Sequence, residues 1–233
     1  IVLSSEEKDF APEGYRLRID SKTVSIAAST KAGAFYGIQT LRKSLPHLSE
    51  KERAYMSKNG RIALPGVDIN DAPRFAYRGT MLDVARHFAT ADSVKRFIDM
   101  IALHGINRMH WHLTDDQGWR IEIKQLPELT KIGSHRSATV IGKNTGKYDG
   151  KPHGGFYTQE QCKDIIAYAA ARNIVIIPEI DLPGHMLAAL AAYPHLGCTG
   201  GPYEVGQIWG VSSDVLCAGN PQTYEFIDKV LGE

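Results

Sequence analysis

Cysteine is scarce in this chain of 233 residues, which contains only Cys162, Cys198 and Cys217. No two of them form a CxxC pair, and this excludes a zinc ribbon and a thioredoxin-type redox motif. Cys198 and Cys217 lie in a glycine-rich, loop-like stretch, so the sequence is compatible with a bridge between them and equally with two free thiols. A bridge across a loop of this size would stabilise the fold by roughly 3 kcal/mol in the chain-entropy model.

A strong excess of one charge and a long apolar run are absent as well. The chain has 27 Lys+Arg residues against 26 Asp+Glu residues, so no global field attracts nucleic acid or an anionic membrane. No apolar run approaches the roughly 20 residues that span a bilayer. No signal peptide or lipidation motif is recognisable, but the chain starts at Ile1 rather than Met, so this says little about the compartment.

The first 73 residues predict part of a small α+β accessory domain. Residues 15–19 (YRLRI) alternate as a strand does, and residues 23–28 (TVSIAA) form a second short strand. Residues 29–45 place their apolar side chains on one helical face, with a Ser-Thr pair at the start that can cap the helix. The segment 64–75, LPGVDINDAPRF, is rich in Pro, Asp and Asn and is predicted to be a linker.

Residues 74–233 alternate between strand and helix patterns and predict an α/β domain. The Gly105 stop after the first helix and the capping box of Thr158 and Gln161 mark helix ends. This order fits a (β/α)8 barrel or a doubly wound sheet. No GxGxxG follows the first strand, and the first two strands end in charged residues, which favours the first three strands of a barrel. The predicted strands are 79–85, 106–113 and 173–180, and the predicted helices are 91–105, 158–172 and 223–231.

Polar side chains follow each of the three predicted strands. Arg86 follows the first strand, Asp115 and Asp116 follow the second, and Asp181 and His185 follow the third. Since the carboxyl ends of parallel strands meet at one rim, these side chains are expected to lie together. An Arg beside carboxylates and a His can hydrogen-bond a polyhydroxyl ligand in fixed directions and can shift the pKa of a neighbouring acid.

The pair His110 and His112 admits two interpretations. Two residues apart on a strand, the histidines face the same side and could bind a divalent metal, as in metal-dependent amidohydrolases, with Asp181 or His185 as further ligands. A hydrogen-bonded pair packed in the barrel wall fits the same spacing and is the interpretation we favour.

Four long motifs resemble the family-20 glycoside hydrolases, the β-N-acetylhexosaminidases. Residues 32–46 are similar to the end of the accessory α/β domain of that family. The resemblance implies a retaining exo-glycosidase that removes terminal β-linked N-acetylglucosamine or N-acetylgalactosamine, without cofactor or metal. In that family the acetamido oxygen of the substrate attacks the anomeric carbon, an exception to the usual two-carboxylate scheme. The four motifs are RGTMLDVARHF (78–88), HWHLTDDQGWRIEIKQLPELTKIGS (110–134), GGFYTQEQ (154–161) and PEIDLPGH (178–185).

The resemblance also implies roles for individual residues. Arg86 matches the arginine that binds the C3 and C4 hydroxyls of the sugar. Asp115 and His185 match the pair that supports the catalytic acid from behind and keeps its pKa suited to protonating a leaving group. Asp181 is expected to orient His185, and Cys198 and Cys217 match cysteines that are bridged in some bacterial relatives. Such a bridge would indicate an oxidising compartment, so we expect a periplasmic, cell-surface or secreted location, or a lysosomal one in a eukaryote.

One departure from the family pattern is large. The catalytic Asp–Glu pair of the family lies in an HxGGDE motif on the fourth barrel strand, and these 233 residues contain no such motif. The chain therefore resembles an internal fragment that is inactive by itself, and either the remainder of the same polypeptide or another chain is expected to complete the barrel. A non-catalytic carbohydrate-binding remnant of the same fold is the alternative, with the metal-dependent amidohydrolase a distant third.

Overall fold

A computed structural model describes residues 2–4, 10–45, 51 and 64–233 and divides the chain into two compact units. Unit 1 comprises Ile1–Arg78 with Ala102–Gly105, and unit 2 comprises Gly79–Ile101 with Ile106–Glu233. No helix of the described residues is long and apolar enough to cross a membrane. Each unit has its own architecture.

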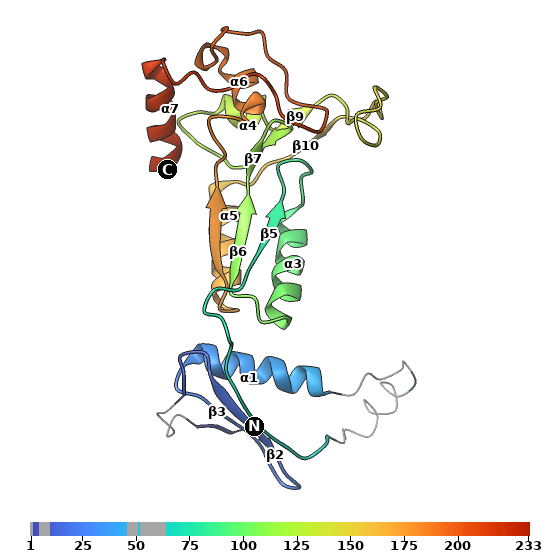
Figure 1. Cartoon of the computed structure of the whole chain (residues 1–233), viewed down its shortest axis with the longest axis vertical. Helices are drawn as coiled ribbons and strands as arrows, with labels where there is room; N and C mark the ends of the chain where they lie inside the picture. Colours follow the sequence, from blue (N-terminus) through green and yellow to red (C-terminus); the bar gives the residue numbers. More distant parts are fainter. Residues whose placement is uncertain (1, 5–9, 46–50, 52–63) are drawn as a thin grey trace. The chain divides into compact units, whose positions relative to one another are not determined.

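Unit 1 is a four-stranded sheet with one helix packed on a face of it (Figure 1). The sheet has the order β1-β3-β2-β4, in which β1 is parallel to β3 and the other pairs are antiparallel. Helix α1 begins at Thr30, whose hydroxyl accepts a hydrogen bond from the backbone N–H of Gly33. The elements are β1 (Val2–Ser4), β2 (Tyr15–Ile19), β3 (Val24–Ala27), α1 (Lys31–Ser44) and β4 (Val67–Asp71).

Strand β4 corrects the prediction of a linker at residues 64–75. Val67–Asp71 pairs along its length with β2 in antiparallel register. Val67 and Ile69 alternate with polar residues and pack against the core of unit 1, where Leu17 is fully buried. The Pro residues of this segment thus flank an edge strand, and its Asp residues lie within that strand. The pairing of β4 with β2 and the packing of Val67 and Ile69 outweigh the local preference of Pro and Asp for turns.

Unit 2 begins with a three-stranded parallel sheet of order β11-β6-β5, as the strand–helix alternation predicts (Figure 1). Helices α3 and α5 lie beside this sheet, and α5 starts with the predicted capping box of Thr158 and Gln161. The α/β class is confirmed. The elements are β5 (Gly79–Asp83), α3 (Ala91–Leu103), β6 (Arg108–His112), α5 (Gln159–Ala170) and β11 (Val175–Glu179).

A second layer of short elements covers the carboxyl ends of these strands. It contains a cluster of buried side chains that includes Trp119, Leu190 and Phe226. The sequence patterns predicted only the last helix of this layer, since two-residue strands have no detectable periodicity. The elements are β7 (Thr114–Asp115), β8 (Gly118–Trp119), α4 (Glu128–Lys131), β9 (His135–Arg136), β10 (His153–Gly154), α6 (Leu187–Ala192), a 3-10 turn (Pro194–Leu196) and α7 (Pro221–Gly232).

Both outer strands of the parallel sheet are edges within the described residues. The apolar sequence of β11 predicts a strand covered on both faces, yet Val175 is half exposed. An apolar groove of about 740 Å³ follows β11, with walls from that strand and from α5 and α7. Its apolar lining includes Ile123, Cys162, Ile166, Ile177, Ile180, Val230 and Leu231.

Candidate active site

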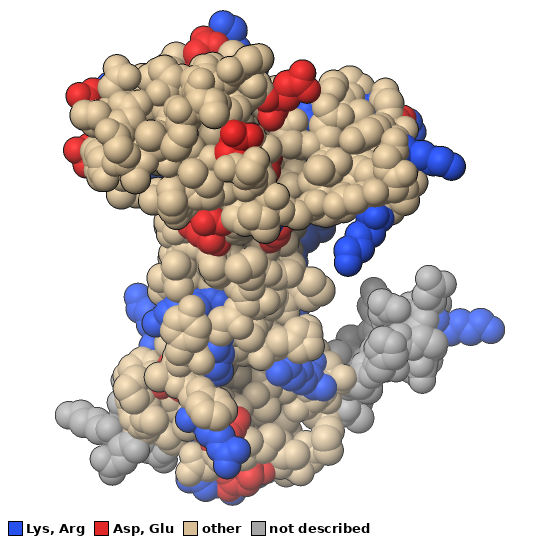
Figure 2. All heavy atoms as spheres, turned by 45° about the horizontal axis from the view of Figure 1, so that its top comes forward, with Lys and Arg blue, Asp and Glu red and all other residues tan. Residues whose placement is uncertain are grey.

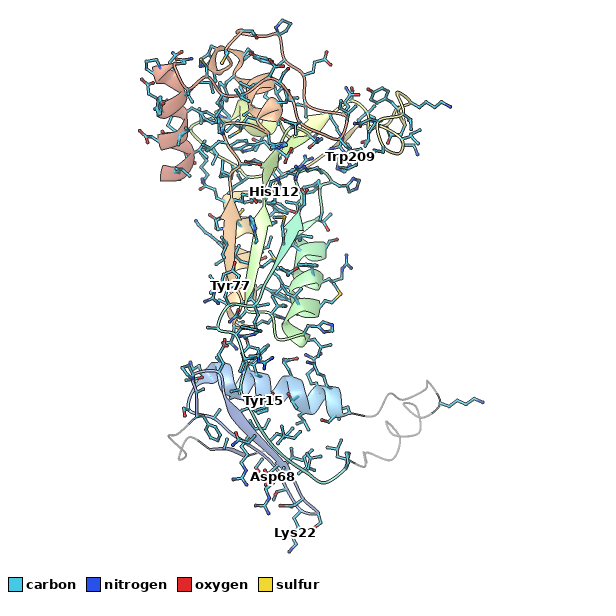
Figure 3. All side chains as sticks on the ribbon, viewed as in Figure 1. Tyr15, Lys22, Asp68, Tyr77, His112 and Trp209 are labelled. Atoms are coloured by element: carbon cyan, nitrogen blue, oxygen red, sulfur yellow. The ribbon has the colours of Figure 1, made fainter. Side chains whose placement is uncertain are left out.

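Three polar residues end the three parallel strands in one row. Asp83 is the last residue of β5, His112 of β6 and Glu179 of β11, and the strand register pairs His112 with both of the others. Residues in register on parallel strands project to the same side of the sheet. The fold therefore gathers an acid, an imidazole and a second acid at the rim where the loops begin, and Figure 3 shows His112 at that end of β6.

His112 is the centre of this row and is almost fully buried. Its Nδ1 lies 2.6 Å from Glu179 Oε2, and its Nε2 lies 2.9 Å from Asp115 Oδ2. Burial alone would lower the pKa of His112, but the hydrogen bonds to the two carboxylates outweigh burial and raise the pKa to about 9. The imidazolium in turn lowers the pKa of Glu179 against the effect of that residue's own burial, and His110 also contacts Glu179.

Asp115 has no solvent-exposed side-chain surface, and each of its oxygens has two donors. Oδ2 accepts from Arg86 Nη2 at 2.7 Å and from His112 Nε2. Oδ1 accepts from the backbone N–H of Asp116 at 2.7 Å and lies 3.2 Å from His185 Nδ1. A carboxylate can accept about four hydrogen bonds, so Asp115 is saturated and its orientation is fixed.

Arg86 joins Asp115 to the first strand. Its Nη1 lies 2.9 Å from Asp83 Oδ2, while Asp83 Oδ1 accepts from the backbone N–H of Arg86 at 3.0 Å. The Arg86 side chain is 30% exposed although Asp115 beneath it is sealed from solvent. This partly exposed side chain has a guanidinium group, whose N–H groups can donate hydrogen bonds to hydroxyl oxygens of a ligand.

His185 is held over Asp115 and Asp116 in a left-handed backbone conformation, with φ of 55°. Its Nδ1 lies 3.2 Å from Asp115 Oδ1 and 3.3 Å from Asp116 Oδ2. Such a backbone conformation is uncommon for residues other than glycine and persists where surrounding contacts fix it. Because Nδ1 faces two carboxylates, Nε2 is the ring nitrogen left to interact with an additional group.

Asp116 is the residue whose role the sequence left unassigned. Its Oδ1 accepts from the backbone N–H of Leu187 at 3.1 Å, at the start of α6, and its Oδ2 faces His185. Burial raises the pKa of Asp116, an effect that the Leu187 hydrogen bond and His185 oppose. Asp116 thus fixes the loop that carries His185 to the end of β7.

The predicted role of Asp181 differs from its place in the structure. The partners of His185 Nδ1 are Asp115 and Asp116, and Asp181 is not among them. Instead, a carboxylate oxygen of Asp181 lies within 4.8 Å of donor atoms of His112 and Asp115, and its backbone N–H donates to Thr114. The Asp115–His185 pair that the resemblance implies is in contact, whereas the contacts of His185 Nδ1 do not include the one expected from Asp181.

Cys198 and Cys217 are free thiols in the structure, so the predicted bridge is not formed there. The backbone bridge between Gly197 and Leu216 nevertheless brings the two cysteines close together, and the nearby Cys217 raises the pKa of the Cys198 thiol. Cys162 is buried in α5, apart from this pair. The folded chain thus brings together the two cysteines that the family resemblance pairs.

Among the residues that the structure describes, two sets of three side chains could approach a metal ion. They are His112, Asp115 and Asp181, and Asp115, Asp116 and His185, with donor atoms within 4.8 Å of one another. Arg86 and the protonated His112 already place positive charge on Asp115, so a divalent cation would compete with both. The arrangement favours the hydrogen-bonded interpretation of His112 over a metal ligand.

Sequence reasoning missed Asp83 and Glu179 as parts of this site. A signal was present, since each predicted strand has an ionisable residue one or two positions before its last residue, and the observed strands end at these residues: GTMLD, RMHWH and VIIPE. The register that aligns these ends was not available from the sequence.

On the surface, Lys and Arg occur together with Asp and Glu on the face seen in Figure 2, as the balanced composition predicts.

Comparison with known proteins identifies two family models along the chain. The model described as glycosyl hydrolase family 20, catalytic domain, matches residues 75–233, and that of domain 2 of the same family matches residues 1–72. A beta-hexosaminidase of Porphyromonas gingivalis is 48% identical over 221 residues, which are 95% of this chain and 27% of that protein. A beta-hexosaminidase of Akkermansia muciniphila is 37% identical across 100% of this chain and 44% of its own length.

Solved structures give the same relationship. The N-acetyl-beta-hexosaminidase of Streptomyces plicatus in complex with Thio-NAglucal superposes with a TM-score of 0.84 at 40% identity, over 99% of this chain and 43% of that one. The beta-N-acetylhexosaminidase of Bacteroides fragilis superposes with a TM-score of 0.77 at 38% identity, over 97% and 40% of the two chains. The chain thus spans less than half the length of each of these four relatives.

Proposed function

The chain belongs to glycosyl hydrolase family 20, and from this we propose that the protein containing it removes terminal β-linked N-acetylglucosamine or N-acetylgalactosamine from glycans. The observation that carries the proposal is the connected set Arg86–Asp115–His185, with contacts of 2.7 and 3.2 Å at a rim of three parallel strands. These are the residues that match the sugar-binding arginine and the acid-supporting pair of the family.

In the proposed reaction the acetamido oxygen of the bound sugar forms a bond to C1 while the glycosidic bond breaks. The leaving oxygen takes a proton from a glutamic acid. Water later attacks C1, breaks its bond to the acetamido oxygen and gives a proton back to the glutamate, with net retention of configuration. Arg86, whose side chain is partly exposed, binds the hydroxyls at C3 and C4. His185, with Nδ1 on Asp115, presents Nε2 to the acid and supports its proton transfer.

The acid and the preceding aspartate are proposed to lie outside these 233 residues, which contain no HxGGDE sequence. The edge of β11 and the groove beside it support a further parallel strand of the same polypeptide pairing there. Hydrogen exchange tests this pairing. The backbone amide of Ile176 lies on the side of β11 away from β6, because the neighbouring Val175 N–H donates to Asn107. This amide should exchange slowly in the full-length protein and faster in residues 1–233 alone, and equal rates would contradict the proposal.

The activity is tested on the full-length protein with a chromogenic N-acetyl-β-glucosaminide and the corresponding glucoside. We expect turnover of the first only, and competitive inhibition by a thiazoline that mimics the oxazoline intermediate. Turnover that the thiazoline leaves unchanged would contradict the substrate-assisted mechanism. Sugar binding without turnover would instead establish a carbohydrate-binding protein of the same fold.

We also propose that Cys198 and Cys217 form a disulfide in an oxidising compartment, periplasmic, cell-surface, secreted or lysosomal. Their proximity in the folded chain, next to the backbone bridge between Gly197 and Leu216, supports this. Peptide mapping by mass spectrometry of protein purified without reductant should show the Cys198–Cys217 cross-linked peptide. Two alkylatable thiols at these positions in native protein would contradict the proposal.

A further inference from the structure

Two buried arginines hold the backbone segments on which the candidate site is built. Arg120 has no exposed surface and Arg136 is 4% exposed, and neither is one of the residues that match family roles. Arg120 lies just after β8, and Arg136 lies in β9. Their partners are almost all backbone carbonyl groups from the segments around Arg86 and Asp115.

All five N–H donors of the Arg120 guanidinium are occupied by carbonyl oxygens. Nε donates to Val84 at 3.1 Å, and Nη2 donates to Ala85 at 2.8 Å and Gln117 at 3.3 Å. Nη1 donates to Ser134 at 2.6 Å and Gly155 at 3.1 Å. Val84 and Ala85 directly precede Arg86, and Gln117 directly follows Asp116, so one side chain connects both parts of the site.

Arg136 acts on the same two segments from the other side. Its Nη1 donates to the carbonyl of Arg86 at 2.9 Å and to that of Gln117 at 3.1 Å, and its Nε donates to Thr139. The Gln117 carbonyl therefore accepts from both arginines. The backbone on each side of the Arg86–Asp115 contact is bound by a guanidinium.

Neither guanidinium is neutralised by a carboxylate within salt-bridge distance among the described residues. Burial, with the nearby Arg136, lowers the pKa of Arg120 to about 10, so the side chain remains protonated at neutral pH. A buried cation that binds only carbonyl dipoles is costly for stability alone. Unlike an apolar side chain, the Arg120 guanidinium has five N–H donors in one plane, and these donors hold four chain segments in place.

The surrounding glycines leave room for this arrangement. A Cβ added to Gly118 would lie 2.1 Å from Arg120 Cζ, and one added to Gly155 would lie 2.4 Å from the Phe88 ring. The ring of Phe88 lies 5.8 Å from the Arg120 guanidinium. A side chain at residue 118 would therefore displace the guanidinium without changing its chemistry.

We propose that Arg120 and Arg136 are positioning residues that set the distance and orientation of Arg86 relative to Asp115 and His185. The proposal rests on the proposed glycosidase function and adds two residues to it. A lysine at either position has three donors on one tetrahedral nitrogen and cannot reproduce the planar set of contacts. Small displacements of binding and catalytic groups are enough to reduce turnover about 100-fold.

The test uses Arg120→Lys, Arg136→Lys and Gly118→Ala in the full-length protein, assayed well below each melting temperature. Arg78→Lys is the matched control, because Arg78 donates to the carbonyls of Phe75 and Gly105 but belongs to unit 1. We expect KM to rise and kcat to fall together in the three variants, with kcat/KM reduced about 10- to 100-fold. The Arg78→Lys control should be less stable to unfolding but should have the KM and kcat of the parent protein.

A crystal structure of each folded variant separates this inference from the proposed function. We expect the distance from Arg86 Nη2 to Asp115 Oδ2, 2.7 Å here, to exceed hydrogen-bonding range. If the unchanged protein proves inactive, the proposed function fails, and this distance still decides whether the two arginines position the site. Variants that keep this distance and a kcat/KM within twofold of the parent would overturn the inference. If the lysine variants do not fold, the result for Gly118→Ala tests the inference in their place.

Discussion

Each of the two units contains an Arg–Asp pair, and the pairs differ in burial rather than in chemistry. Arg16 and Asp68 pair across β2 and β4 at 2.8 and 2.9 Å with both side chains more than 40% exposed. Arg86 and Asp115 pair at 2.7 Å with Asp115 entirely buried. Water and salt screen the exposed Arg16–Asp68 pair, which therefore contributes little to stability. The buried carboxylate of Asp115 has no contact with water, so its charge is stabilised only by neighbouring protein groups.

The largest effect is expected from Asp115→Asn in the full-length protein. An amide cannot accept from all four donors, so both Arg86 and His185 lose a charged partner, and kcat should fall about 100- to 1000-fold. Asp68→Asn is the matched control in unit 1 and should change kcat less than twofold. Steady-state kinetics on an N-acetyl-β-glucosaminide measure both, and a small effect of Asp115→Asn would remove this residue from the proposed mechanism.

A core substitution in unit 1 should give the opposite result. Leu17 has no exposed surface, so Leu17→Ala removes buried methyl groups and should lower the free energy of unfolding of that unit by about 2–5 kcal/mol. The kcat of the protein should be retained below the melting transition. Calorimetry and kinetics on the same preparation check both statements, and a parallel loss of kcat would show that unit 1 shapes the site.

Arg86→Lys tests the ligand-binding end of the buried pair. A lysine keeps the charge, but its donors lie on one tetrahedral nitrogen and cannot reproduce the contacts that Nη1 and Nη2 of Arg86 make with Asp83 and Asp115. Loss of one charge-assisted hydrogen bond is worth about 1.5–3 kcal/mol. We expect kcat/KM to fall about 10- to 100-fold, chiefly through KM. Arg16→Lys is the control from the exposed pair, and equal effects of both substitutions would refute the contrast.

The smallest expected effect concerns the pH dependence of stability. The pKa of His112 is raised to about 9 in the fold, so the protonated form is favoured by folding. The contribution of His112 to the free energy of unfolding, roughly 1–3 kcal/mol, is fully present below pH 6.5. It is lost as the pH rises through 9. In the His112→Asn variant, the free energy of unfolding should no longer fall by this amount between pH 6.5 and pH 9. Urea unfolding at pH 6.5 and pH 9 measures it, and the same decline in both proteins would contradict the assignment.

The sequence predicted much of the regular structure because periodicity is a local property. The strand at 15–19, the capped helix after Thr30 and the capping box at Thr158 all occur where the patterns indicated. Strand β4 was missed because its Pro- and Asp-rich context favours turns locally, and only pairing with β2 overrides that preference. The short elements above the sheet have no periodic signal to detect.

The order of strands and helices, the α/β class and the polar residue types after each strand were determined by the sequence alone, since each depends on residues near one another in the chain. Apart from the Asp115–His185 pair, which the family resemblance implied, which acid meets which base was decided by tertiary structure. His185 faces Asp115 and Asp116 rather than Asp181, and His112 joins Asp115 to Glu179 across two strands. His112 and Glu179 lie 67 residues apart and meet through the register of the parallel sheet. Asp115 and His185 lie 70 residues apart and meet through the loops that follow the strands.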